Sequence, residues 1–251
     1  DHVVRVGLCR SAVGPEDLAD LVLRQTDAVI FDHGPRHIAS LAAFTALSAV
    51  AALPASTGGV FVTFEEAPSD LMQNVRSFGW DLEGLVRSGK IAVVDATPDP
   101  GAEVIATGPY DLSALLARIE NAIRSVGAKR VILDAIGALF PQLTDPNIIR
   151  RELHRIAAGL RRLNVTTLIT MERTDEEGGV GRWGVEEFVA DNVILLRNRL
   201  EYEKRRRTVE ILKFRGATHH KGEYPFTIDA EDGVTIIPLS AIELKQKSSQ
   251  L

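Results

Sequence analysis

The chain has 251 residues, which is enough for one large α/β domain and short for two typical ones. Its single cysteine, Cys9, excludes an intramolecular disulfide and fits a reducing cytosol, so we expect a cytoplasmic protein. The net charge of −5 argues against a general nucleic-acid binder, and the chain contains no run of about 18 apolar residues that would predict a membrane span.

From residue 28 onward, short β-branched runs alternate with longer helical patterns. Leucine and isoleucine recur at helical spacing over residues 111–126 and 147–163, and Asn164 supplies a stop for the second pattern. Such alternation predicts an α/β fold with a mostly parallel sheet that is covered on both faces. The expected strands are Val29–Phe31, Val60–Phe64, Ile91–Asp95, Val131–Asp134, Thr166–Met171 and Val193–Arg197.

The pattern changes near residue 199. Residues 199–216 alternate as in a hairpin, and "YPFTI" and "VTIIPL" continue as short strand-like pieces. We therefore expect C-terminal antiparallel strands that extend the sheet within one domain, residues 29–243. Residues 1–28 form an N-terminal segment that the pattern does not place, and residues 244–251 form a polar linker or tail.

A pair of carboxylates follows the second expected strand. The run "GGVFVTF" is largely apolar and ends abruptly in Glu65 and Glu66. Ligands of open α/β sheets bind beyond the carboxyl ends of the strands, where two carboxylates are well placed to polarise a water molecule or to hold a metal-bound one. The alternative is that both residues open the next helix, because the positive end of a helix favours acidic side chains.

Asp134 closes the expected strand "RVILD". An apolar strand that ends in aspartate is the Walker B arrangement, in which the carboxylate holds Mg²⁺ through its water shell. Aspartate also commonly caps the element that follows a strand, so the pattern alone leaves both roles open.

Cationic side chains gather in "ILKFRGATHHKGEYPF", around an expected strand end and a glycine-containing loop. They are Lys213, Arg215, His219 and Lys221. Cations in this position are able to contact phosphates, and an arginine does so in bidentate fashion. The alternative is the solvated rim of a hairpin.

Four segments in this order resemble the N-terminal ATPase domain of the KaiC family of cyanobacterial clock proteins. They are "GGVFVTFEEAPSDLMQNVRSFGWDLEGLVRSGKIAVVDATPDP", "RVILDAIGALF", "RWGVEEFVADNVILLRN" and "RRRTVEILKFRGATHHKGEYPFTI", and the likeness runs from about residue 38 to the C-terminus. The resemblance implies a RecA-like P-loop NTPase core. It also implies a homo-oligomer, a hexameric ring with ATP and Mg²⁺ between subunits, and it makes a KaiB-like protein a candidate partner.

The resemblance also implies roles at individual positions. Glu65 and Glu66 match paired catalytic glutamates that act on the attacking water, and Asp134 matches the Walker B aspartate that serves the metal. Lys213 and its neighbours match a segment that reaches across the ring to the nucleotide of the adjacent subunit. The positions that match nucleotide contacts are Ser77, Lys213, Phe214, Arg215, His219 and Asp229.

The phosphate-binding loop departs from the family. The family pattern is G-T-x-G-x-G-K-T, whose glycines and lysine hold the phosphates. Here "FDHGPRHIASLAAF" places Ile38 and Ala39 where Gly-Lys is expected, and Pro35 removes an N–H donor. The resemblance still assigns nucleotide contact to Ser40 and Leu41 and metal contact to Ser40. As written, this loop should bind triphosphate badly.

Two explanations fit this loop. One is divergence of the nucleotide site, and the other is a gene-model or reading-frame error before about residue 40; reading codons 28–42 in all three frames distinguishes them. Two functions follow. The first is a KaiC-like, ring-forming domain that binds ATP and hydrolyses it slowly. The second is a nucleotide-defective ring or partner-binding scaffold with a degenerate loop.

Overall fold

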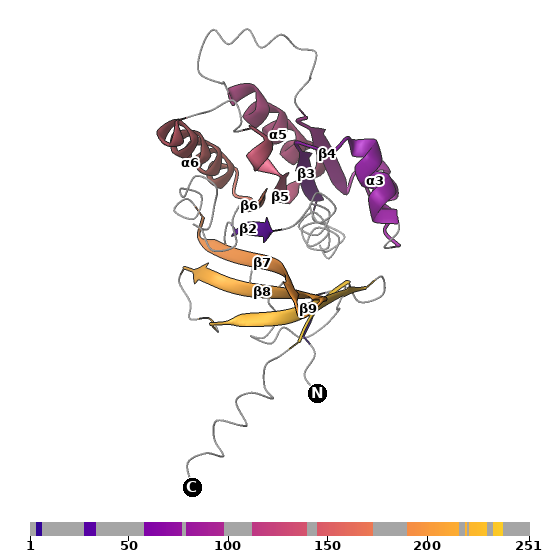
Figure 1. The fold of residues 1–251 in the computed structure, drawn as a ribbon. Coiled ribbons are helices and arrows are strands. Elements are labelled where there is room, and N and C mark those ends of the chain that lie inside the picture. Colours follow the sequence, from indigo (N-terminus) through magenta and orange to yellow (C-terminus); the bar gives the residue numbers. More distant parts are fainter. Residues whose placement is uncertain are drawn as a thin grey trace.

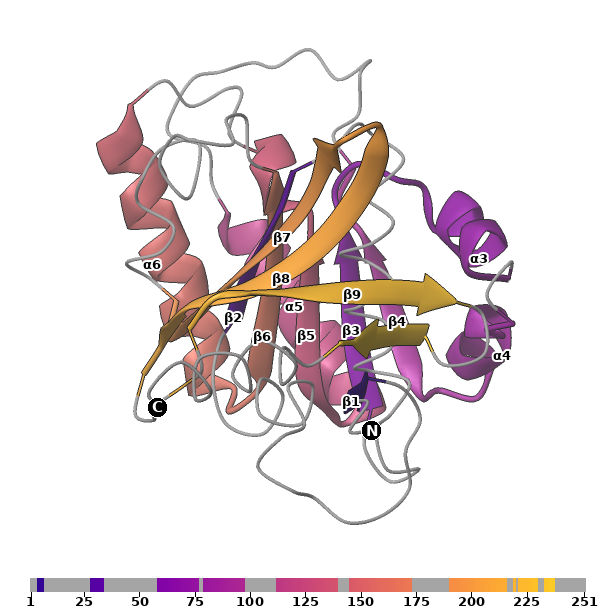
Figure 2. The same ribbon diagram turned by 60° about the horizontal axis from the view of Figure 1, so that its bottom comes forward.

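The strands form one ten-stranded sheet in the order β1-β10-β9-β8-β7-β2-β6-β5-β3-β4 (Figures 1 and 2). The structure is a computed structural model. It describes residues 4–6, 28–33, 58–76, 79–97, 112–139, 145–172, 190–215, 219, 221–229 and 233–237.

Six strands form the parallel part of the sheet, and each overlaps one of the six strands expected from the sequence. β2 lies between β6 and β7 and is parallel to both, and β3 lies between β4 and β5. Their bounds are Ala28–His33 for β2, Gly58–Thr63 for β3, Ile91–Asp95 for β4, Ala128–Asp134 for β5, Thr166–Glu172 for β6 and Asn192–Glu201 for β7.

The remaining strands extend the sheet in antiparallel fashion, as expected for the C-terminal region. β8 (Lys204–Phe214) forms a long hairpin with β7, and β9 (Glu223–Asp229) and β10 (Gly233–Ile236) follow. Tyr202 and Glu203 at the hairpin turn have φ of 47° and 66°, the left-handed conformations that a tight two-residue turn between twisted strands requires. At the far edge, β1 (Val4–Val6) pairs with β10.

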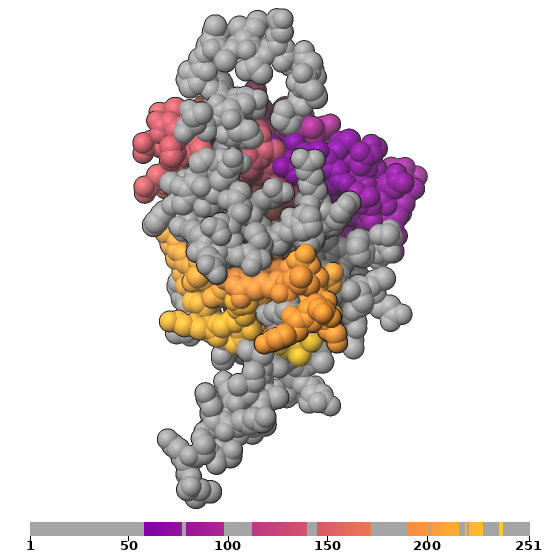
Figure 3. Space-filling model, viewed as in Figure 1, coloured from indigo at the N-terminus to yellow at the C-terminus, as the bar shows by residue number. Residues whose placement is uncertain are grey.

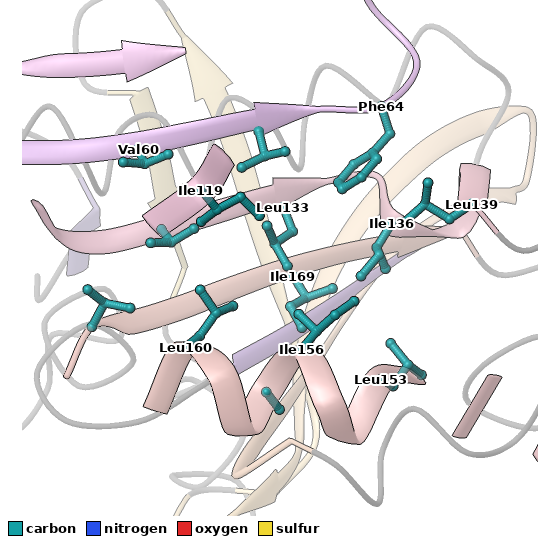
Figure 4. Close-up of a cluster of buried hydrophobic side chains, with 14 of the residues drawn as sticks. Val60, Phe64, Ile119, Leu133, Ile136, Leu139, Leu153, Ile156, Leu160 and Ile169 are labelled. Carbon is teal, nitrogen blue, oxygen red and sulfur yellow. The ribbon is translucent and has the colours of Figure 1, made fainter. Parts of the chain in front are cut away.

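Helices cover both faces of the parallel strands (Figure 1). The bounds are Pro68–Arg76 for α3, Leu82–Arg87 for α4, Ser113–Val126 for α5 and Pro146–Arg162 for α6, with a 3₁₀ helix, η1, at Ile136–Leu139. Strand side chains alternate between two apolar clusters: Val60 and Val62 lie in the cluster that contains α5 and α6, whereas Phe61 lies in the cluster that contains α3 and α4. Figure 4 shows Ile156 and Leu160 of α6 facing the first cluster.

Local sequence sets the helix ends. Asp145 caps α6 by accepting a hydrogen bond from the backbone N–H of Asn147 at 2.8 Å, and Asn164 follows the helix with φ 54°. The predicted stop at Asn164 is therefore confirmed. Gly127 ends α5 with φ 59°.

These elements confirm the expected fold class, a RecA-like α/β core with a parallel sheet, flanking helices and added antiparallel strands. Within the described parts of the chain, every helix is too short or too polar to cross a membrane.

Candidate functional site

The candidate site begins where β3 and β5 end side by side. Thr63, the last residue of β3, is in register with Asp134, the last residue of β5. Beyond the ladder, the backbone N–H of Phe64 donates to the carbonyl oxygen of Asp134 at 2.8 Å. The Phe64 side chain is fully buried, so it anchors the chain just before the two glutamates. The two carboxylate-bearing segments predicted from the sequence therefore meet at one edge of the sheet.

Thr63 fixes the backbone of Glu66. Its buried hydroxyl donates to the carbonyl oxygen of Glu66 at 2.6 Å and lies 3.2 Å from the Glu66 backbone N–H, which donates to it. Glu65 and Glu66 therefore lie in a bend, and helix α3 begins only at Pro68. The structure therefore contradicts the alternative that Glu65 and Glu66 are the first residues of the next helix.

Asn74, on the second turn of α3, holds the side chain of Glu66. Its Nδ2 donates a hydrogen bond to Oε1 of Glu66. The pKa of Glu66 is raised above its ordinary value, mainly by partial burial; the Asn74 hydrogen bond lowers it, and the charge of Asp70 raises it. A carboxylate with a pKa moved toward neutrality is suited to accept a proton from water.

The surroundings of the Asp134 carboxyl strongly disfavour its charged form. Its pKa is raised to about 7, mainly because burial disfavours the charged form; a hydrogen bond from Thr170 opposes the rise, and the charges of Glu65 and Glu66 add to it. The hydroxyl of Thr170, a buried residue of β6, donates to Oδ1 of Asp134. Negative charge is concentrated at this edge, which a bound cation would relieve.

The donor set fits Mg²⁺, which proteins bind through one or two carboxylates together with substrate phosphates and water. Asp134 supplies a carboxylate at the end of a core strand, and Glu65 and Glu66 place two more within electrostatic range. The residues that support these carboxylates are Thr63, Asn74 and Thr170. The sequence did not single them out, because threonine and asparagine at such positions are ordinary in strands and helices.

The cations predicted to contact phosphates lie in another part of the molecule. Nζ of Lys213 donates to the carbonyl oxygen of Ala190 at 2.8 Å, and Nη1 of Arg215 lies 2.9 Å from Oδ1 of Asp191. Arg161, in the last turn of α6, lies 3.4 Å from the other oxygen of Asp191. Asp191 directly precedes β7, so this cluster lies near the amino ends of the parallel strands.

The carboxylates and these cations are therefore far apart within one chain. From β5 to β8 the sheet order crosses β6, β2 and β7, which corresponds to about 19 Å at the usual strand spacing. Figure 3 shows the purple surface of residues 58–97 and the orange surface of β7 and β8 as separate areas of one face. One chain does not bring the two groups of predicted residues together.

The remaining predicted residues are placed in part. Phe214 and His219 are neighbours, with ring centroids 6.5 Å apart. The backbone of Asp229 ends β9, but its side chain is outside the description. Ser40, Leu41 and Ser77 also lie outside the described residues, so their assignment remains a prediction.

Comparison with known families gives a clear result. A family model described as "ATPase: KaiC" matches residues 50–241. This match includes Glu65, Glu66, Asp134, Lys213 and Arg215, and it begins after Ser40 and Leu41.

Individual relatives are close in sequence. The chain is 56% identical over 193 residues to circadian clock protein KaiC3 of Synechocystis sp., a match that covers 77% of this chain and 38% of that protein. It is 57% identical over 194 residues to the circadian clock oscillator protein KaiC of Parathermosynechococcus lividus, covering 77% and 35%. The corresponding protein of Nostoc sp. is 55% identical over 193 residues, covering 77% and 37%. The match thus spans little more than a third of each relative.

Proposed function

Because the chain belongs to the KaiC family of ATPases, we propose that it binds Mg²⁺·ATP and hydrolyses it slowly between adjacent copies of a homo-oligomeric, hexameric ring of the circadian-clock type. The observation that carries this proposal is the meeting of Glu65, Glu66 and Asp134 at one sheet edge, where supporting hydrogen bonds hold Glu66 and Asp134 in place.

Asp134 would hold Mg²⁺ through a water of its coordination shell, together with the hydroxyl of Ser40. Mg²⁺, when bound, would neutralise charge on the phosphates. Thr170 donates a hydrogen bond to Oδ1 of Asp134, so Oδ2 keeps its acceptor capacity for a water of the metal. The high pKa of Asp134 implies that proton loss accompanies metal binding near neutral pH.

Glu65 and Glu66 would act on the attacking water. Glu66 is held by Asn74 through one carboxylate oxygen, so its other oxygen can accept a hydrogen bond from water in a defined direction. Glu65 is exposed next to it and adds negative charge that favours proton acceptance.

Lys213 and Arg215 would act on the nucleotide of the neighbouring copy. Their separation of about four strand spacings from Asp134 supports action across a subunit contact rather than within one chain. Cations supplied in this way stabilise the charge that spreads over the transferred phosphoryl group.

The sequence of the phosphate-binding loop favours a second function. Ile38 and Ala39 stand where the family has Gly-Lys, so a ring or partner-binding scaffold without hydrolysis, with a KaiB-like protein as one partner, is the alternative.

ATP binding, turnover and native mass, measured on the same preparation, separate the two functions. Micromolar ATP binding, hexamers and slow turnover would support the ATPase. Changing Glu65 and Glu66 together to Gln should lower turnover by about 100-fold or more without weakening ATP binding. The matched control is Glu83→Gln on α4, an exposed glutamate that pairs with Arg76, which should leave turnover unchanged. A chain that binds no ATP contradicts the ATPase proposal and favours the scaffold.

A further inference from the structure

Asn74 is joined to the candidate site through a helix that is itself firmly packed. Leu71 and Val75, on either side of it along α3, are 2% and 5% exposed and lie in the apolar cluster that contains Phe61 of β3. The helix is therefore fixed relative to the strand that leads into Glu66. Asn74 lies on the exposed side of this helix and reaches back to the Glu66 carboxylate.

The chemistry of the contact is directional. An asparagine amide nitrogen can only donate, and it meets Oε1 of Glu66, so Oε2 keeps its acceptor capacity. The carboxylate of Asp70 on α3 raises the pKa of Glu66, and the carboxylate of Asp134 on β5 lies within electrostatic range of Glu66. The Asn74 amide is a neutral donor, so it favours the ionised form of Glu66. Partial burial and the charge of Asp70 disfavour that form.

We propose that Asn74 is a positioning residue for hydrolysis, because its side-chain amide orients the Glu66 carboxylate toward the attacking water. This inference rests on the proposed ATPase function. In this role Asn74 acts on the attacking water through the Glu66 carboxylate.

The contact contributes little to folding. It is a hydrogen bond between the exposed Asn74 and the half-buried Glu66, and such bonds contribute on the order of 1 kcal/mol, whereas Leu71 and Val75 hold the helix. Variants at position 74 should therefore fold, and their effects should appear in catalysis.

Three variants of the full chain test this role. Asn74→Asp has nearly the same shape but replaces the donor with a carboxylate, Asn74→Ala removes the side chain, and Gln73→Ala is the control at an exposed neighbouring position of α3. We expect kcat to fall about tenfold in Asn74→Asp and about threefold in Asn74→Ala, with KM for Mg²⁺·ATP within about twofold of the unaltered chain. Gln73→Ala should match the unaltered chain.

A second measurement does not depend on turnover. Carboxyl carbon NMR of the ligand-free protein should show the pKa of Glu66 rising in both Asn74 variants, by about one unit in Asn74→Asp, and staying constant in Gln73→Ala. The acidic limb of the kcat/KM profile, which reports pKa values of the free enzyme, should move to higher pH by the same amount.

The possible outcomes separate this inference from the function on which it rests. If the unaltered chain shows no turnover, that result contradicts both the ATPase proposal and the positioning role of Asn74. Turnover by the unaltered chain that persists at full rate in Asn74→Asp overturns the positioning role alone. An unchanged Glu66 titration in that variant does the same.

Discussion

At the scale of the residue, the surroundings of the Asp134 carboxyl disfavour its charged form and lower the stability of the native state. Its partly buried carboxyl ends a core strand beside two further carboxylates, and its pKa is raised from 3.8 to about 7. Proteins accept such a cost at sites that bind cations or protons. The consequence is a measurable pH dependence of folding.

Asp134→Asn should stabilise the protein at pH 8 and not below pH 4, with Mg²⁺ and nucleotide absent. Below the unfolded pKa of 3.8, Asp134 is protonated in both states. As the pH rises toward 7, the unfolded chain releases this proton first, so the native state progressively loses stability, by as much as about 4 kcal/mol. Asparagine avoids that loss. Denaturant unfolding across this pH range should show a gain for the variant of about 2 kcal/mol or more at pH 8.

Asp95→Asn is the matched control at the end of β4, which is separated from β5 by β3. The pKa of Asp95 is lowered, first by a hydrogen bond from the backbone of Thr97, so its charged form is favoured in the native state. Its replacement should bring no stabilisation at pH 8. A similar gain in both variants would mean that the effect of Asp134→Asn reflects general charge reduction at this edge.

Sequence patterns predicted the charged residues of the candidate site but not the residues that hydrogen-bond to them. Glu65, Glu66 and Asp134 stand out because charged residues end apolar strands. Thr63, Asn74 and Thr170 give no such signal, because their importance comes from contacts between residues up to 36 positions apart. Such contacts become visible only once the strands are placed side by side.

At the scale of the elements, the sequence predicts the bounds of a strand best where its side chains are apolar on both faces of the sheet. β4 has the predicted bounds, whereas β7 continues four residues past the predicted end at Arg197. Arg197 lies 2.6 Å from Glu210, and Arg199 lies 3.2 Å from Glu223, so ion pairs with neighbouring strands replace apolar contacts there. The predicted end at Arg197 marks this change of contacts, and the hairpin alternation predicted for residues 199–216 covers the last residues of β7. The short helices α3 and α4 were not predicted as separate elements.

The junction of α5 and β3 depends on a glycine. A Cβ on Gly58 would lie 2.1 Å from the backbone carbonyl oxygen of Val126, the last residue of α5. Gly58→Ala should therefore lower the free energy of unfolding by about 2 kcal/mol or more, because backbone cannot move aside as a side chain can. Thermal and denaturant unfolding measure this change.

Gly137→Ala in η1 is the matched control. A Cβ at that position meets nothing within 4 Å, so the substitution should be neutral or should stabilise by a few tenths of a kcal/mol. Equal destabilisation by both variants would argue against the close approach at Gly58.

At the scale of the whole molecule, the two groups of predicted site residues lie on different parts of the sheet. The carboxylates lie at the carboxyl ends of β3 and β5, and Lys213 and Arg215 lie where β8 meets the start of β7. Head-to-tail contacts that repeat around a closed ring bring different surfaces of adjacent copies together. Sequence resemblance implies such a ring, and the separation of the two groups along the sheet order supports the proposal that they act across a subunit contact.

Mixing two inactive variants tests the shared site most directly. One carries Glu65→Gln with Glu66→Gln, and the other carries Lys213→Ala with Arg215→Ala. Each should hydrolyse ATP far more slowly than the unaltered chain while keeping its native mass. In a random equal mixture, about a quarter of the contacts would combine intact carboxylates with intact cations, so activity should return to about a quarter of normal. Activity that stays at the mean of the two variants, in rings shown by native mass to be mixed, would contradict a site shared between copies.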